Sequence, residues 1–126
     1  MSDPRSIIEE IGRELSEYRI TVDLVDTLGG PIPAAALTNL TLTLYAESGT
    51  TLINSVQRQN ILNSGRGTID GAGHLVITLG TNDMPIVDTG AFEEWHIALI
   101  EWNYNGGISQ GRHELAFRVR NMALVP

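Results

Sequence analysis

The stretch that decides the fold is Glu93–Tyr104, which reads EEWHIALIEWNY and is followed by the turn residues Asn105, Gly106 and Gly107. A second alternating run returns over residues 112–121, so the two runs predict a long β-hairpin. The first run carries apolar residues on both of its faces, and such a strand needs cover on both faces. We therefore expect it to be a central strand of a packed sheet rather than a surface ribbon.

Upstream of the hairpin, five shorter runs alternate between apolar and polar residues, which is the period of a half-buried strand. They lie at residues 18–24, 40–46, 51–55, 68–70 and 74–79. Turns that contain glycine join most of these runs, and no helix of about ten to fifteen residues separates them. The sequence therefore predicts an all-β fold, an antiparallel β-sandwich of about seven strands. Residues 56–64 fit either a helical turn or a strand edge.

The segment at residues 1–17 has helical periodicity instead. Its apolar residues recur mainly at spacings of three and four: Ile7, Ile8, Ile11 and Leu15. Asp3 can cap a helix and Pro4 suits its first turn, so we predict an N-terminal amphipathic helix over residues 3–17. Gly12 weakens such a helix by about 1 kcal/mol, so its apolar stripe must dock, either on its own domain or on a neighbouring subunit. The sandwich domain is expected at residues 18–126.

Composition limits the class of protein. A chain of 126 residues forms one domain plus at most one appended element, and the lack of cysteine excludes disulfides and thiolate metal sites. The formal charge of −7 disfavours contact with nucleic acid. Arg112, Arg118 and Arg120 share one strand face with Glu114, so we interpret them as a solvated or ion-paired set. No long apolar run is present, so we expect neither a signal peptide nor a membrane segment.

No residue pattern for catalysis or for a cofactor is complete. The histidines His74, His96 and His113 fall on three different predicted strands without the spacing of a metal site. Glu93 and Glu101 share a strand face, but at about 3.3 Å per residue they lie roughly 26 Å apart, too far for a glycosidase pair. Neither a nucleophile elbow nor a nucleotide-binding glycine motif occurs. We expect a protein that is not an enzyme and holds no metal or cofactor.

Four aromatic residues leave a second function open. Trp95, Trp102, Tyr45 and Tyr104 could form a stacking platform for a sugar. Trp95 and Trp102 have opposite parity on one strand, so they face opposite sides of it, while Tyr45 lies on the face opposite Leu42. A carbohydrate-binding β-sandwich module that uses Trp95 or Tyr45 is therefore the alternative function.

A series of short strings along residues 39–121 resembles a class of viral structural domain. The strings are NLTLTLY at 39–45, TLINS at 51–55, NILN at 60–63, GHLVITL at 73–79, EWHIALIEWNY at 94–104 and HELAFRVRN at 113–121. Together they are similar to the N-terminal β-sandwich domain of phage baseplate upper proteins and to small proteins of phage head and neck modules. The resemblance implies an immunoglobulin-like sandwich that serves as a building block of the virion.

From this resemblance we expect a non-enzymatic structural component of a phage virion, in capsid decoration or in head, neck or tail assembly. Its partners would be other virion proteins (capsid, portal or tail) and further copies of itself, because repeated identical contacts close most simply with symmetry. It would be made in the host cytoplasm and reside in the virion, without contact with nucleic acid or membrane. The residues selected for the protein interface are those of the apolar stripe: Ile7, Ile8, Ile11 and Leu15.

Overall fold

The computed structural model describes residues 5–26, 29–46, 51–87, 90–104, 106 and 109–122, and it consists mainly of strands. The strands are β1 (Arg5–Ile7), β2 (Gly12–Arg13), β3 (Tyr18–Asp23), β4 (Leu37–Ala46), β5 (Gln59–Asn60), β6 (Gly67–Ile69), β7 (His74–Leu79), β8 (Glu93–Tyr104) and β9 (Ser109–Arg120). Two short 3-10 helices, η1 (Ala34–Ala36) and η3 (Thr81–Asp83), lie between strands.

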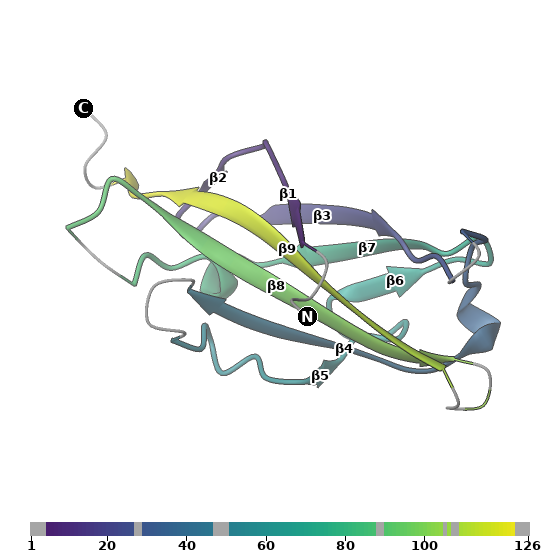
Figure 1. Ribbon diagram of the computed structural model, residues 1–126. Helices are drawn as coiled ribbons and strands as arrows, with labels where there is room; N and C mark the ends of the chain where they lie inside the picture. Colours follow the sequence, from purple (N-terminus) through teal and green to yellow (C-terminus); the bar gives the residue numbers. More distant parts are fainter. Residues whose placement is uncertain are drawn as a thin grey trace.

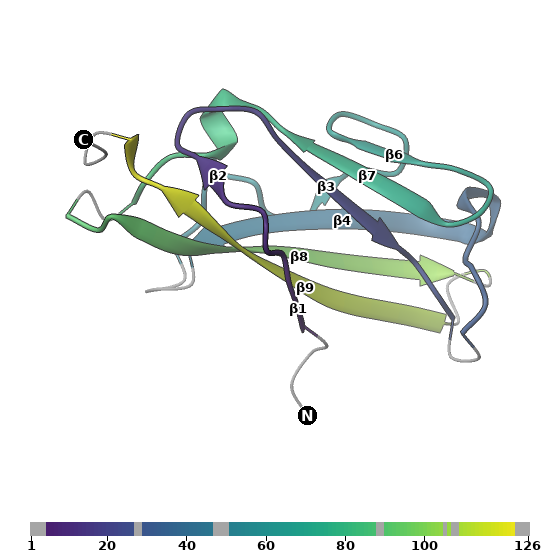
Figure 2. The same ribbon diagram turned by 90° about the horizontal axis from the view of Figure 1, so that it is seen from above.

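The strands form two sheets that face one another as a sandwich (Figure 1). The large sheet has the strand order β1-β9-β8-β4-β5, with β2 also paired to β9, and the small sheet has the order β3-β7-β6. Figure 2 shows the small sheet as a separate layer above the large one. The all-β sandwich that the sequence predicts is therefore confirmed.

The hairpin of β8 and β9 forms the centre of the large sheet. The two strands pair without a break from Glu93 opposite Arg120 to Tyr104 opposite Ser109. On its other side β8 pairs with β4, so the prediction of a central strand is confirmed. Residues 51–55 are not a strand, and Leu52 makes only an isolated bridge to Tyr45. The ambiguous segment at 56–64 contains the edge strand β5 and no helix.

The core lies between the sheets and is built by alternate residues of each strand. Along β8 the even-numbered positions from Ala98 onward are buried and belong to the core cluster, as Ile100 and Trp102 illustrate. From β9, Phe117 has no exposed surface and stacks on Tyr18 with ring centroids 5.0 Å apart. Burial of such large apolar side chains is the main favourable term in folding.

The helix predicted over residues 3–17 is wrong. In its place, residues 5–13 add two short strands to the edge of β9, both parallel to it. The backbone N–H of Ile8 continues this pairing by donating to the carbonyl of Ala116 at 2.8 Å. A bare strand edge presents unpaired donors and acceptors, and pairing with them outweighs the helical preference of a segment that contains Gly12 and adjacent β-branched residues.

Gly12 shows how closely this segment approaches the core. A Cβ atom built at Gly12 would lie 2.5 Å from the Met84 side chain and 2.9 Å from the ring of Tyr18. Any larger residue would push β2 away from η3 and from β3. The glycine that weakens a helix is thus the residue that permits the observed packing.

The predicted apolar stripe is divided by this arrangement. Ile8 packs against the core and Ile11 is half-buried. Ile7 and Leu15 are exposed to 59% and 56% of their surface. Within the segment expected at residues 1–17, the strands β1 and β2 belong to the large sheet of the domain expected at residues 18–126.

A buried carboxylate, Asp83, ties the segment between β4 and β6 to η3. Its Oδ1 accepts hydrogen bonds from Asn54 Nδ2 at 2.9 Å and from Arg66 Nη2 at 2.8 Å. Its Oδ2 accepts the backbone N–H of Gly80 at 2.8 Å. The side chain of Asp83 is only 5% exposed and that of Arg66 only 17%, so the ion pair is largely removed from water.

We expect Asp83→Ala to lower the free energy of unfolding by about 3–5 kcal/mol, because it leaves the Arg66 guanidinium buried without its carboxylate. Urea unfolding followed by circular dichroism measures the change. Asn82→Ala is the matched control, since Asn82 is the exposed neighbour and its truncation should cost under about 0.5 kcal/mol. Equal unfolding midpoints for the two variants would contradict the role of Asp83.

Candidate interaction face

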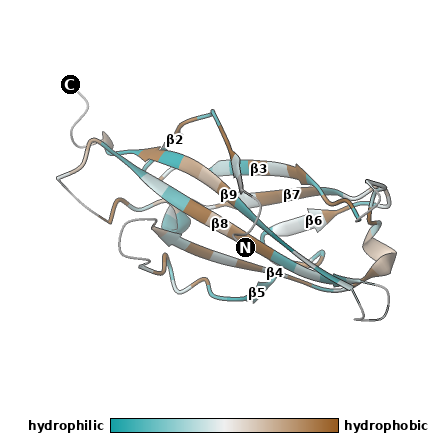
Figure 3. Ribbon diagram, viewed as in Figure 1, coloured by the Kyte–Doolittle hydropathy of each residue, from teal (hydrophilic) through white to brown (hydrophobic). Residues whose placement is uncertain are grey.

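The outer face of the large sheet, which points away from the small sheet, is built by alternate residues of β4, β8 and β9. Strand pairing places these residues in rows that cross the three strands. The rows are Asn39–Asn103–Gln110, Thr41–Glu101–Arg112, Thr43–Leu99–Glu114 and Tyr45–Ile97–Ala116, with Trp95–Arg118 beyond them. The rows therefore change from polar at Asn103 to apolar at Ile97, and the charged row Glu93–Arg120 follows at the far end of the face. In Figure 3 the middle of β8 is brown, with teal on both sides of it.

We use the name apolar end for five residues of this face: Ile7, Trp95, Ile97, Leu99 and Ala116. Ile7 joins it from β1, because that strand pairs with β9 and sets Ile7 opposite Ala116. Ile7 and Trp95 expose 59% and 36% of their surface, while Leu99 is half-buried. Exposed aromatic and aliphatic side chains gathered on one sheet face are typical of a protein contact surface.

Among the described residues, the apolar end is covered by side chains of its own face. The Tyr45 hydroxyl reaches across β8 and donates to Glu114 Oε1 at 3.3 Å, which helps to leave Ile97 with no exposed surface. The Arg118 guanidinium lies over the Trp95 ring, 5.5 Å from its centroid. Within the described ranges no strand or helix packs over this face. From the sequence, both faces of β8 are predicted to be covered by other parts of the protein. The outer face of β8 is covered only in part.

The polar end of the face is a shallow groove of about 440 Å³. Its lining residues come from four strands or their flanks: Asn39, Thr41, Arg58, Glu101, Asn103, Gln110 and Arg112. Glu101 and Arg112 form an ion pair across β8 and β9 at 3.4 Å. The groove thus offers amide and hydroxyl groups around the ion pair of Glu101 and Arg112, and Arg58 adds a positive charge.

The carboxylates and histidines considered from the sequence do not meet in one site. Glu93 pairs with Arg120 at 3.3 Å, at the opposite end of β8 from Glu101. His74 lies 2.6 Å from Asp23 on the small sheet, while His96 and His113 lie on β8 and β9. Over the described part of the chain no group of three or more acidic or histidine residues is placed to hold a metal ion.

Glu94 and His96 form a buried pair that alternation alone does not reveal. His96 Nε2 lies 2.5 Å from Glu94 Oε2, and the two side chains are 0% and 10% exposed. The same carboxylate accepts the backbone N–H of Val87 at 2.9 Å, and the His96 ring packs edge-on against Phe117. Burial lowers the pKa of His96 below its usual value, and the hydrogen bond to Glu94 opposes this shift only in part.

This pair predicts that the protein loses stability on mild acidification. An unfolded His96, with a pKa near 6.5, takes up a proton more readily than the folded one, so the free energy of unfolding falls as the pH falls below about 6.5. We expect His96→Leu to flatten this decline between about pH 7.5 and 5.5, as measured by urea unfolding at each pH. His113, whose pKa is also lowered by burial, contributes in the same direction.

His74→Gln is the matched control for this measurement. The pKa of exposed His74 is raised by its hydrogen bond to Asp23, so His74 favours the folded state at low pH and its loss should steepen the decline. A His96→Leu profile parallel to that of the wild type would contradict the assignment.

Comparison with known proteins adds no assignment to this geometry. Over the described residues no helix is both long and apolar enough to cross a membrane. Scans of this chain against protein-family models, curated proteins and solved structures find no match.

Proposed function

We propose that this chain is a non-enzymatic structural component of a phage virion, a capsid decoration or head, neck or tail assembly protein that acts by protein–protein contacts. The resemblance of the strings along residues 39–121 supports the virion role and an immunoglobulin-like arrangement of the sandwich. The observation that carries the contact role is the apolar end of the outer face. Its proposed partners are further copies of the chain and other virion proteins: capsid, portal or tail.

The composition of the apolar end suits a protein contact. Trp95 stacked under Arg118 combines two residue types that dominate the binding energy of protein interfaces. Leu99 and Ile7 extend the apolar area on either side, across β8 and β1. Glu114 is held by Tyr45, so the nearest carboxylate is partnered within the face rather than left for a partner to desolvate.

The N-terminal strand connects this proposal to the residues selected from the sequence. Ile7 lies on the same face as Ile97 and Ala116, so it is the member of the stripe that we assign to the interface. Ile8 faces the core instead. Leu15 is exposed at the turn between β2 and β3, beyond the rows of the outer face.

We expect Ile7→Asp to weaken self-association by about tenfold or more, since it places a charge within an apolar contact. Light scattering of the purified protein over a concentration series measures the solution mass, and thermal unfolding checks that the sandwich remains folded. Leu15→Asp is the matched control, because Leu15 is equally exposed but lies off this face. Unchanged association of the Ile7→Asp variant, or an equal loss with Leu15→Asp, would contradict the assigned interface.

The second candidate function, a carbohydrate-binding module, is favoured by one observation. Tyr45 and Trp95 lie on the same face of the large sheet as the polar groove. Aromatic faces can stack on a sugar ring, and the amides of Asn39 and Asn103 can donate and accept hydrogen bonds with hydroxyl groups. Because Trp95 and Asn103 lie eight residues apart on β8, roughly 26 Å, the ligand would be an extended saccharide whose separate rings reach the two ends of the face.

This alternative predicts weak saccharide binding on a glycan array that disappears with Trp95→Ala. Asn103→Ala separates the two functions, because it lies in the polar groove away from the apolar end. It should reduce saccharide binding while leaving self-association unchanged. An array without any bound glycan would eliminate the carbohydrate role and leave the structural role in place.

A further inference from the structure

The strand β1 leaves one edge of the large sheet open. It is the last strand in the order of that sheet, and within the described ranges no other strand pairs with its far side. The backbone N–H of Ile8, directly after β1, donates to the carbonyl of Ala116 on β9. Because successive residues of a strand point their backbone groups to opposite sides, the N–H and C=O groups of Ile7 and Arg5 point away from β9. These groups can pair with a further strand.

Both edges of the small sheet, in contrast, are protected. β3 forms one of these edges, and its exposed residues include the charged Arg19 and Asp23. β6 forms the other, and Asn63 Oδ1 accepts the backbone N–H of Ile69 there at 2.8 Å. Charged side chains and occupied backbone groups keep edge strands from pairing with other chains. β1 instead presents Ile7, which exposes 59% of its surface.

A second copy of β1 matches this open edge. When two copies lie antiparallel with Ser6 opposite Ser6, Arg5 of each copy lies opposite Ile7 of the other. Both residues point their N–H and C=O groups to the open side, so each such pair can exchange two hydrogen bonds. The arrangement has a twofold axis at Ser6, and twofold dimers are the commonest symmetric assemblies of soluble proteins.

We propose that two copies of this chain pair through β1 in this antiparallel register, so that their large sheets form one continuous sheet. The inference rests on the self-contact of the proposed function and specifies its geometry. Ile7 lies on the outer face opposite Ala116, within the apolar end. The two apolar ends therefore become neighbours across the twofold axis, and the dimer presents them to a further virion protein as one surface.

The apolar end also explains why the partner is a second copy. β1 has only three residues, and a pair of such short strands is marginal in water without an adjoining apolar contact. In the proposed register, Ile7 of one copy lies diagonally across the strand pair from Ile7 of the other, on the same face. Their contact removes exposed apolar surface from water and supports the short run of hydrogen bonds.

A cysteine at position 6 tests the register, because the chain contains no cysteine of its own. In the proposed dimer Ser6 lies opposite Ser6 of the second copy in a pair without mutual hydrogen bonds, with Cα atoms about 4.5 Å apart. A disulfide needs Cα atoms about 4.4–6.8 Å apart. We expect Ser6→Cys to form a covalent dimer on mild oxidation, seen as a doubled mass on a non-reducing gel.

Leu15→Cys is the matched control for this crosslink. Leu15 is exposed like Ser6 but lies between β2 and β3, away from the open edge. We expect the dimer of Ser6→Cys to form about tenfold faster or more, because only position 6 is held opposite its own copy. Equal rates for the two variants would overturn the proposal, since random collisions would then account for both dimers.

Ile7→Pro tests the backbone pairing separately. Proline removes the N–H that points to the open edge and leaves the hydrogen bonds between β1 and β9 in place. Ile7→Ala is the matched control, because it loses the same apolar side chain but keeps the N–H. We expect Ile7→Pro to associate about tenfold more weakly than Ile7→Ala in a light-scattering concentration series.

The two variants at position 7 distinguish this inference from the proposed function. Equal association of Ile7→Pro and Ile7→Ala, both weaker than the wild type, would overturn the strand pairing and leave the apolar contact in place. A Ser6→Cys dimer together with unchanged association of Ile7→Asp would support the pairing and contradict the contact at the apolar end.

Discussion

The pairing register of β8 and β9 is the constraint on which the rest of the structure depends. It runs the full length of both strands and decides which side chains face the small sheet and which face outward. A slip of one residue would exchange the two faces of a strand, sending Trp95 inward and Trp102 outward. The core, the apolar end and the close contact of Trp102 with Gly111 all follow from this single alignment.

Much of this alignment can be predicted from the sequence, because strand periodicity is a local signal. The alternation of β3, β4, β7, β8 and β9 is visible in the order of apolar and polar residues, and so is the opposite parity of Trp95 and Trp102. The N-terminal segment shows where such a signal fails. Its isoleucines fit a helical stripe, but the open edge of β9 is a non-local partner whose backbone groups decide the outcome.

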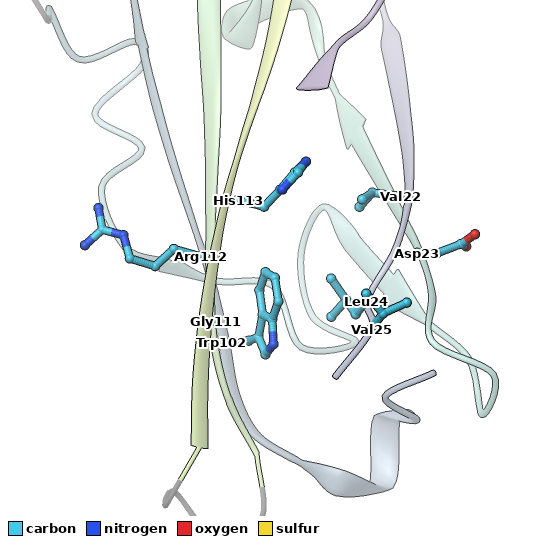
Figure 4. Close-up of a pocket in the computed structure, with 8 residues that line it drawn as sticks. All are labelled: Val22, Asp23, Leu24, Val25, Trp102, Gly111, Arg112 and His113. Carbon is cyan, nitrogen blue, oxygen red and sulfur yellow. The ribbon is translucent and has the colours of Figure 1, made fainter. Parts of the chain in front are cut away.

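The sites could be predicted less well, because they are assembled from distant parts of the chain. The rows of the outer face require the register between three strands, which alternation along one strand does not give. The Asp83 carboxylate accepts hydrogen bonds from Asn54, Arg66 and Gly80. Nothing in the sequence around Asp83 indicates that its side chain is buried. A pocket lined by Val22, Leu24, Trp102 and Gly111 likewise joins β3 to the hairpin, across more than seventy intervening residues (Figure 4). The pairing of Gly111 with Trp102 is its one signal, and it becomes visible only when the hairpin is aligned.

The parallel attachment of β1 and β2 to β9 has a mechanical consequence. In a parallel pair, the start of one strand and the end of the other lie at opposite ends of the contact. Tension between the start of β1 and the end of β9 would therefore load the hydrogen bonds of both short strands together, in shear. A hairpin pulled from its open end would instead release its bonds one at a time. The two short strands thus give the chain a clamp that resists stretching along its own axis.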